Sequence, residues 1–296
     1  MIRELVVGSC IFLLVAYTVL TKALPVIIYH GLGDNCCNED IVRFINRLGL
    51  SNQTTIVSLM IGKDPQDDLF KSYFDDCNRQ VSHVCRLLRG RAELRDGFHA
   101  IGLSQGGLFL RAVQQRCGHE IKMRRLITLA SPHIGVSSFP GCPEEGASTW
   151  CRVAEKMIES AVYSKFVQRR IVPAQYYREP KEYRKYLRSN RFLADLNQEG
   201  PRFVEEKAKR YKENLGKLEK FVLFRFANDT VLTPPSSAWF GYSDHELGVD
   251  LRQKMVQDTL GLDELIAKSK IEFRLVPGDH LQMSNETIRE IAGYLV

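Results

Sequence analysis

The chain has 296 residues, of which 44% are hydrophobic and 26% charged, and its formal net charge is +6. This length and composition predict one large domain or two ordinary ones with a sizeable core. The sequence has no fixed-period repeat and no low-complexity segment, which excludes repeat architectures. Its densest basic stretch, residues 207–220, interleaves acidic residues with the basic ones. We therefore predict a solvated helix face there and no nucleic-acid partner.

The first 23 residues have the features of a secretory signal peptide. An apolar run from Leu5 to Leu20 follows a basic residue, and Thr21 and Ala23 fit a small-residue cleavage site. The run has 16 residues, whereas a membrane span needs about 20, so an uncleaved anchor is the less favoured alternative. We predict a mature chain of residues 24–296 in the secretory pathway, with at most peripheral membrane contact.

The secretory pathway permits disulfides and N-glycosylation. Of the eight cysteines, Cys10 would leave with the signal peptide, so seven would stay in the mature chain. An odd number implies at least one free thiol or an intermolecular bridge. Three sequons are glycosylation candidates, at Asn52, Asn228 and Asn285.

Residues 24–133 alternate apolar, β-rich runs with helical patterns. Near-continuous apolar strands between helices are typical of a parallel sheet covered on both faces, and hence of an α/β fold. Residues 134–217 then contain helical stretches but no convincing strand, so we predict a helical insertion within one α/β domain. The predicted strands are 25–31, 55–62, 97–104, 125–132, 220–229 and 270–280, and the predicted helices of the first region are 67–89 and 105–117.

The stretch Gly102-Leu103-Ser104-Gln105-Gly106 fits the pattern G-x-S-x-G between a predicted strand and a predicted helix. This context is typical of the nucleophile elbow of the α/β-hydrolase fold. Its turn is so tight that side chains at the flanking positions would collide, which explains the glycines. Ser104 would also lie at a helix N-terminus, where developing negative charge is stabilised.

A serine hydroxyl needs a base, and the base needs an orienting acid. In this fold their order along the chain is Ser, acid, His. His280 follows the last predicted strand and Asp229 closes the strand before it, so we predict these two as the base and the acid. Asp279 suits the role of acid less well, because neighbouring side chains diverge. Among the other histidines, His133 at a strand end is the alternative base, whereas His119 ends the elbow helix and His245 lies in a polar segment.

The tetrahedral oxyanion needs two backbone donors, which map to Gln105, after the nucleophile, and to Leu32, in the loop after the first strand. The adjacent Cys36 and Cys37 in that loop are poor metal ligands, because neighbouring side chains diverge and no C-x₂-C partner set exists. A redox pair stays open, since strained disulfides are reduced more easily. We favour a third interpretation, in which the two cysteines brace the loop that carries Leu32.

Together these residues resemble the palmitoyl-protein thioesterases. The match covers nearly the whole mature chain, so it is more specific than G-x-S-x-G alone. One departure is ASPHIG (130–135), which is more typical of general lipases. The matching stretches are HGLGDNCCN (30–38), GLSQGGLFLRAVQQRC (102–117), FLADLNQE (192–199), FANDTVLTPPSSAWFG (226–241) and GDHLQMS (278–284).

The resemblance implies a lysosomal serine hydrolase that cleaves the thioester between long-chain fatty acids and cysteines of S-palmitoylated proteins. The acyl-enzyme would form on Ser104, the insertion would contribute to the acyl groove, and no metal or cofactor would be needed. An oxygen-ester lipase with the same triad and a non-catalytic lipid carrier are the alternatives. The resemblance further implies the disulfides Cys36–Cys37, Cys85–Cys117 and Cys142–Cys151, which would leave Cys77 as the free thiol.

Overall fold

The computed structural model describes the chain except for residues 1–22, 52–53, 140–141, 143–148, 242–250 and 296. The predicted signal peptide, apart from Ala23, lies outside the described residues, as do Cys10, Asn52 and His245. Among the helices of the described segments, none is long and apolar enough to cross a membrane.

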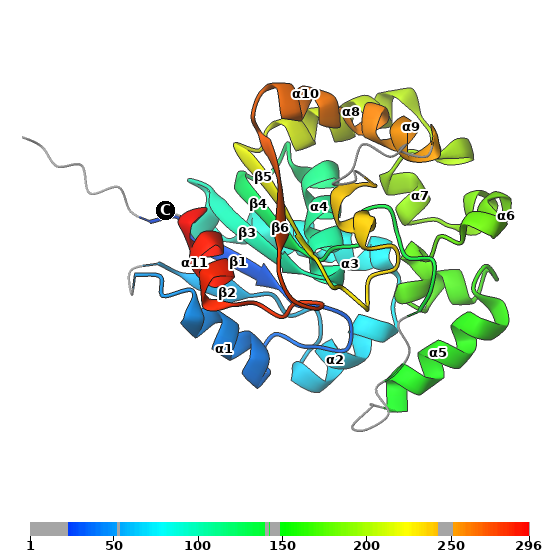
Figure 1. The fold of residues 1–296 in the computed structure, drawn as a ribbon, viewed down its shortest axis with the longest axis horizontal. Helices are drawn as coiled ribbons and strands as arrows, with labels where there is room; N and C mark the ends of the chain where they lie inside the picture. The colour runs from blue at the N-terminus through cyan, green and yellow to red at the C-terminus, as the bar shows by residue number, and fades with distance from the viewer. Residues whose placement is uncertain (1–22, 52–53, 140–141, 143–148, 242–250, 296) are drawn as a thin grey trace, which may run out of the picture.

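A parallel sheet forms the centre of the molecule (Figure 1). In the described part of the chain it has six strands in the order β2-β1-β3-β4-β5-β6, and every neighbouring pair is parallel. Each predicted strand is present, and the predicted α/β fold is confirmed. The strands are β1 Val26–Tyr29, β2 Ile56–Ser58, β3 Phe98–Leu103, β4 Met123–Leu129, β5 Lys220–Phe226 and β6 Ile271–Val276.

Helices connect the strands and cover the sheet. The helices of the described segments are α1 Glu39–Arg47, α2 Pro65–Tyr73, α3 Cys77–Gly90, α4 Gln105–Cys117, α5 Thr149–Ala161, α6 Tyr183–Ser189, α7 Leu193–Leu196, α8 Glu205–Gly216, α9 Leu251–Leu260, α10 Leu262–Ala267 and α11 Asn285–Gly293. Short 3₁₀ segments occur at Ala92–Leu94, Val167–Arg169, Pro173–Tyr176, Pro180–Glu182, Gly200–Arg202 and Pro235–Trp239.

Both faces of the sheet are buried, as the near-continuous apolar strands predict. Along β1, Ile27 packs into a core shared with α3, α4, α8 and α10, whereas Ile28 packs into a second core shared with α1 and α11. Figure 1 shows α1 and α11 close together, away from α8, α9 and α10. Successive side chains of a strand therefore point to opposite faces of the sheet, where they pack against two separate layers of helices.

The prediction of one helix over residues 67–89 is wrong, because the structure has two helices there. α2 ends before Phe74, whose backbone is extended and forms an isolated antiparallel bridge with Ile171. α3 then begins after Asp76, whose carboxylate accepts hydrogen bonds from the N–H groups of Asn78 and Arg79. An N-cap of this kind starts a new helix. α2 and α3 are therefore separate helices, although the helical spacing of apolar residues continues from one to the other.

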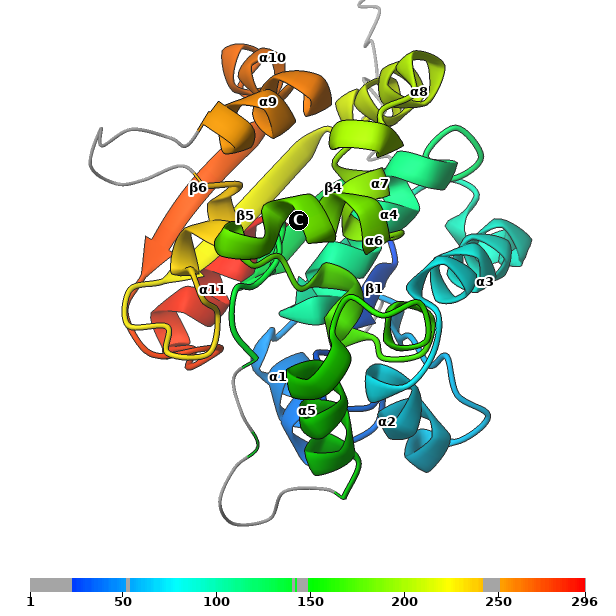
Figure 2. The same ribbon diagram turned by 90° about the vertical axis from the view of Figure 1, so that its right-hand side faces the viewer.

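The region 134–217 is helical, with isolated bridges and no strand among its described residues. Figure 2 shows α5, α6 and α7 in front of the sheet, with α5 beside α2. α8 differs, because it packs directly against α4 and places Leu215 in the core of the sheet. The last part of the predicted insertion thus covers the sheet, as a crossover helix between two parallel strands does.

Candidate active site

Ser104 lies at the sharp turn between β3 and α4. Its backbone has φ 49° and ψ −120°, and its N–H donates to the carbonyl oxygen of Leu129 at 2.7 Å. A Cβ atom at Gly102 would lie 2.2 Å from the Cα of Gly107, and one at Gly106 would lie 2.2 Å from the carbonyl oxygen of Tyr29. Only glycine fits at either position, so the turn has the geometry of a nucleophile elbow.

The structure brings Ser104, His280 and Asp229 together. His280 Nε2 lies 3.0 Å from Ser104 Oγ, and His280 Nδ1 lies 2.8 Å from Asp229 Oδ2 and 3.0 Å from its Oδ1. The three residues follow β3, β6 and β5, whose carboxyl ends lie at one edge of the sheet. This is the arrangement of nucleophile, base and orienting acid that the order of residues predicts.

Asp229 is held rigidly by the turn that follows β5. Its Oδ1 also accepts hydrogen bonds from the N–H groups of Val231 and Leu232, at 3.0 and 2.8 Å. The neighbouring Asp279 contacts no ring atom of His280. Its Oδ1 accepts from the backbone N–H of His280 and of Thr230, and these bonds lower the pKa of the Asp279 carboxyl. Asp279 therefore joins the two loops, while Asp229 is the carboxylate that contacts the imidazole ring.

The alternative base, His133, lies inside the core. Its Nε2 is 3.0 Å from the hydroxyl oxygen of Thr128, and its ring stacks on Phe240 with centroids 4.6 Å apart. Burial, with a smaller effect of Arg111, holds its pKa well below the ordinary value of histidine. His119 is partly exposed beside Glu120. The structure thus places His280, and neither of these histidines, at the serine.

The two predicted oxyanion donors lie on either side of the serine turn. The N–H of Gln105 is the first of α4, and the loop of Leu32 approaches so closely that a Cβ at Gly31 would lie 3.4 Å from the Cβ of Ser104. Within the described residues, neither of these two N–H groups donates to a protein acceptor. Both are therefore free to bind an anion that forms on a carbonyl attacked by Ser104.

A cavity of about 490 Å³ borders Ser104 and His280. The region 134–217 contributes six of its lining residues, which are Val136, Phe139, Cys142, Cys151, Pro173 and Tyr176. Tyr176 is buried, which raises its pKa well above the ordinary value, and its hydroxyl donates to the side-chain oxygen of Gln105 at 2.9 Å. Sequence reasoning did not identify these residues one by one, because an irregular cavity wall carries no fixed spacing.

Six of the seven described cysteines form three disulfides, and the seventh, Cys77, is a free, buried thiol. The Cys77 N–H donates to the side-chain oxygen of Gln175, and burial raises the pKa of the thiol well above its ordinary value. Such a cysteine is a core residue rather than a reactive one. Of the sequons, Asn228 and Asn285 are exposed. The disulfides are Cys36–Cys37, Cys85–Cys117 and Cys142–Cys151.

Comparison with known proteins identifies the family. The family model described as Palmitoyl protein thioesterase matches residues 25–280. The chain belongs to this family. Its match contains the elbow serine, the acid after β5 and the histidine after β6, so the candidate site lies within the part that defines the family.

Three relatives illustrate the extent of the similarity. Palmitoyl-protein thioesterase 1 of Caenorhabditis elegans is 34% identical over 275 residues, which cover 90% of each chain. A palmitoyl-protein thioesterase-dolichyl pyrophosphate phosphatase fusion of Schizosaccharomyces pombe is 35% identical over 89% of this chain, which spans 42% of that protein. Lysosomal thioesterase PPT2-B of Xenopus laevis is 28% identical over 86% of this chain and 85% of its own.

Proposed function

We propose that this chain is a serine thioesterase that hydrolyses the thioester between a long-chain fatty acyl group and a cysteine of an S-palmitoylated protein. Membership of the family and the names of the nematode and fission-yeast relatives support this substrate class. The observation that carries the proposal is the 3.0 Å contact between His280 Nε2 and Ser104 Oγ beside the cavity.

In the acylation step, Ser104 Oγ attacks the carbonyl carbon of the thioester while His280 Nε2 takes the hydroxyl proton. Asp229 stabilises the imidazolium that forms. The oxyanion accepts hydrogen bonds from the N–H groups of Leu32 and Gln105. The C–S bond then breaks, the proton passes from His280 to the departing cysteine sulfur, and the acyl group stays on Ser104. Since a thiolate is a good leaving group, this transfer needs little help from the imidazolium.

In the deacylation step, a water molecule takes the place of the thiol. His280 removes its proton as the water oxygen attacks the acyl carbon, and the same two N–H groups stabilise the second oxyanion. The bond to Ser104 Oγ breaks, and His280 returns the proton to that oxygen. The products are the free fatty acid and the regenerated enzyme, and no metal or cofactor takes part.

We assign the acyl chain to the cavity beside Ser104. Residues 24–296 form one catalytic domain in this proposal, and the helical insertion of about 134–217 supplies the apolar wall formed by Val136, Phe139 and Pro173. Each buried CH₂ group of the acyl chain contributes about 0.8 kcal/mol to binding. A pocket of this size lies within the range that encloses ligands of several hundred daltons.

We further propose a route through the secretory pathway to the lysosome. The predicted signal peptide, the three disulfides and the name of the Xenopus laevis relative support this location. The exposed Asn228 and Asn285 are glycosylation candidates, and a glycan on Asn228 would lie next to Asp229. The partners in this proposal are S-palmitoylated proteins, with at most peripheral membrane contact and no nucleic acid.

The decisive test compares matched palmitoyl thioester and oxygen-ester substrates. The wild type should cleave the thioester faster, and Ser104→Ala should abolish cleavage while the melting temperature stays unchanged. A fluorophosphonate probe should label the wild type and not the variant. Faster cleavage of the oxygen ester would indicate a lipase, and absence of labelling in the folded wild type would indicate a lipid carrier.

A further inference from the structure

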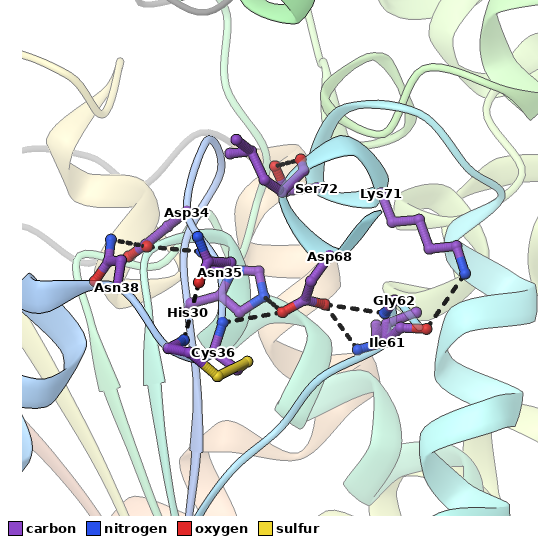
Figure 3. A network of polar contacts seen from close by, with 12 residues as sticks. His30, Asp34, Asn35, Cys36, Asn38, Ile61, Gly62, Asp68, Lys71 and Ser72 are labelled. Atoms are coloured by element: carbon purple, nitrogen blue, oxygen red, sulfur yellow. Dashed lines mark hydrogen bonds and ion pairs between the residues drawn. A yellow bond between two sulfur atoms is a disulfide. The ribbon is translucent and has the colours of Figure 1, made fainter. Parts of the chain in front are cut away.

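His30 and Asp68 form a buried pair beside the loop that follows β1 (Figure 3). Their side chains are 2% and 1% exposed, and His30 Nε2 lies 3.1 Å from Asp68 Oδ2. His30 comes directly after β1, and Asp68 lies in the first turn of α2. The proposed reaction uses neither residue, yet a buried carboxylate is costly unless hydrogen bonds satisfy it.

The Asp68 carboxylate accepts hydrogen bonds on both oxygens, as Figure 3 shows. Oδ1 accepts from the N–H groups of Ile61 and Gly62 at 2.7 and 3.2 Å, and Oδ2 accepts from the N–H of Cys36 at 2.9 Å. Burial raises the pKa of this carboxyl, but the contact with His30 and the N–H donors outweigh burial and hold the pKa below its ordinary value. A charged carboxylate thus ties α2 to the loop after β1.

His30 connects the Asp68 carboxylate to the peptide group between Gly31 and Leu32. His30 Nδ1 lies 2.9 Å from the carbonyl oxygen of Gly31. A carbonyl oxygen only accepts hydrogen bonds, so Nδ1 is the nitrogen that donates in this contact. The Gly31 C=O and the Leu32 N–H belong to one planar trans peptide, in which the two bonds point in opposite directions. Fixing this carbonyl therefore fixes the direction of the Leu32 N–H.

α2 also holds the far side of the loop and the second donor residue. Ser72 Oγ accepts from the N–H of Gly33 at 2.9 Å, and the Ser72 carbonyl oxygen accepts from Gln105 Nε2 at 3.2 Å. Gly33 has φ +76°, and a Cβ there would lie 2.5 Å from the hydroxyl oxygen of Tyr73. No side chain fits between this loop and α2. Leu32 is thus held on both sides by contacts to a single helix.

We propose that His30 and Asp68 are positioning residues that aim the Leu32 N–H at the oxyanion. This inference rests on the proposed function, because it gives a task to the pair within the proposed oxyanion hole. The pair acts through the Gly31 peptide and does not touch the substrate. Its loss weakens binding of the transition state more than binding of the substrate, so kcat falls while KM changes little.

Two substitutions of His30 distinguish the contributions of its two ring nitrogens. Asn brings an amide nitrogen close to the place of Nδ1, and Gln brings one close to the place of Nε2. His30→Gln loses the donor to Gly31, and kcat should fall about 10–100-fold, below the full loss of an oxyanion donor, with KM within about twofold. His30→Asn keeps that donor, and kcat should stay within about fivefold of the wild type. Asp67→Asn, on the half-buried neighbour of Asp68, is the matched control and should keep the wild-type kcat.

Binding of a palmityl trifluoromethyl ketone supplies a readout that a purely structural role would not change. The ketone forms a tetrahedral oxyanion on Ser104, whereas palmitate binds without one. In His30→Gln, affinity for the ketone should fall by the same factor as kcat/KM, and affinity for palmitate should not change. Equal loss of kcat in both folded His30 variants, or a raised KM with unchanged kcat, would overturn the inference.

Ser72→Ala is the milder variant for the case in which a His30 variant does not fold. It removes the acceptor of the Gly33 N–H, together with the donor to the Leu69 carbonyl oxygen within α2. The value of kcat should fall about 2–10-fold at unchanged KM. Wild-type kcat in the folded Ser72→Ala variant would then contradict the inference. A failure of the proposed function would be distinguishable from a failure of this inference. If the wild type cleaves only oxygen esters, the proposed substrate class is wrong. The same variants measured on an oxygen ester would then still test the positioning role.

Discussion

Two carboxylate–imidazole pairs border the candidate site, and they differ in what the second ring nitrogen contacts. In Asp229–His280 that nitrogen faces the hydroxyl of Ser104, which can give up a proton, whereas in Asp68–His30 it faces the carbonyl of Gly31, which cannot. The His280 side chain is 13% exposed and that of His30 only 2%. In our proposals, the same two side-chain types thus serve proton transfer in one pair and backbone geometry in the other, according to the third group that the ring contacts.

The largest effect should come from breaking the first pair with Asp229→Asn. The amide can keep an oxygen toward the N–H groups of Val231 and Leu232, so its NH₂ group faces His280 Nδ1. That contact selects the tautomer with the proton on Nε2, which cannot accept the proton of Ser104. We expect kcat to fall about 10⁴-fold in single-turnover hydrolysis of a palmitoyl thioester.

Asp279→Asn is the matched control for this prediction, because Asp279 also lies beside His280 but contacts only its backbone N–H. Its kcat should stay within about tenfold of the wild type, because it leaves the imidazole tautomer unchanged. Losses of similar size in the two folded variants would argue against the assignment of Asp229 as the orienting acid.

The second pair should contribute to stability as well as to the direction of the Leu32 N–H, and Asp68→Asn tests the contribution to stability. A neutral amide cannot satisfy all the donors that meet the carboxylate, so the free energy of unfolding should fall by about 3 kcal/mol near neutral pH. The folded pKa of Asp68 lies below its unfolded value, so its contribution is present above the unfolded pKa and is lost as pH falls through the folded one.

The difference in melting temperature between the wild type and Asp68→Asn should therefore be largest near pH 6 and shrink below about pH 4, the unperturbed range of an aspartate. Calorimetry across this pH range measures it. A difference that does not change with pH would mean that Asp68 is not charged in the folded protein.

A smaller effect is expected from Tyr176→Phe, which removes the hydrogen bond to the side chain of Gln105. The free energy of unfolding should fall by about 1 kcal/mol, as measured by urea denaturation. The value of kcat should change less than about threefold, because the backbone N–H of Gln105, and not its side chain, faces the oxyanion. A much larger loss of kcat would assign Tyr176 to the chemistry of the site.

The smallest effect should follow from the paired change Cys36→Ser and Cys37→Ser. The Cys36 N–H would still donate to Asp68, so the loop should stay anchored without the disulfide. We expect kcat to fall less than about fivefold, short of the loss of an oxyanion donor. A loss near 10²-fold in a steady-state assay would make the disulfide, and not the Asp68–His30 pair, the main support of Leu32.

The proximity of Ser104, Asp229 and His280 could be predicted because each residue has a local signature. Ser104 lies in a spaced glycine motif, and Asp229 and His280 end apolar strands. In a parallel sheet the carboxyl ends of the strands meet at one edge, so three local patterns were enough to predict that side chains from distant parts of the chain lie together.

The partnership of His30 and Asp68 has no such signature. The two residues are 38 positions apart in sequence, and their contact depends on how α2 packs against the loop after β1. The break between α2 and α3 was missed for a related reason, since the bridge of Phe74 to Ile171 joins segments that are remote in sequence. Contacts of this kind are decided by tertiary packing and leave no periodic pattern.

The position of β6 at the edge of the sheet has a consequence for biogenesis. β6 follows the other five described strands in the chain, and His280 lies in the loop that follows it. In the proposed mechanism, a nascent chain that has paired β1 to β5 thus carries Ser104 without its base. Such a chain should be unable to form an acyl-enzyme with lipids that it meets during folding. Reactivity toward a serine-directed probe would therefore report the docking of this last strand and the completion of folding.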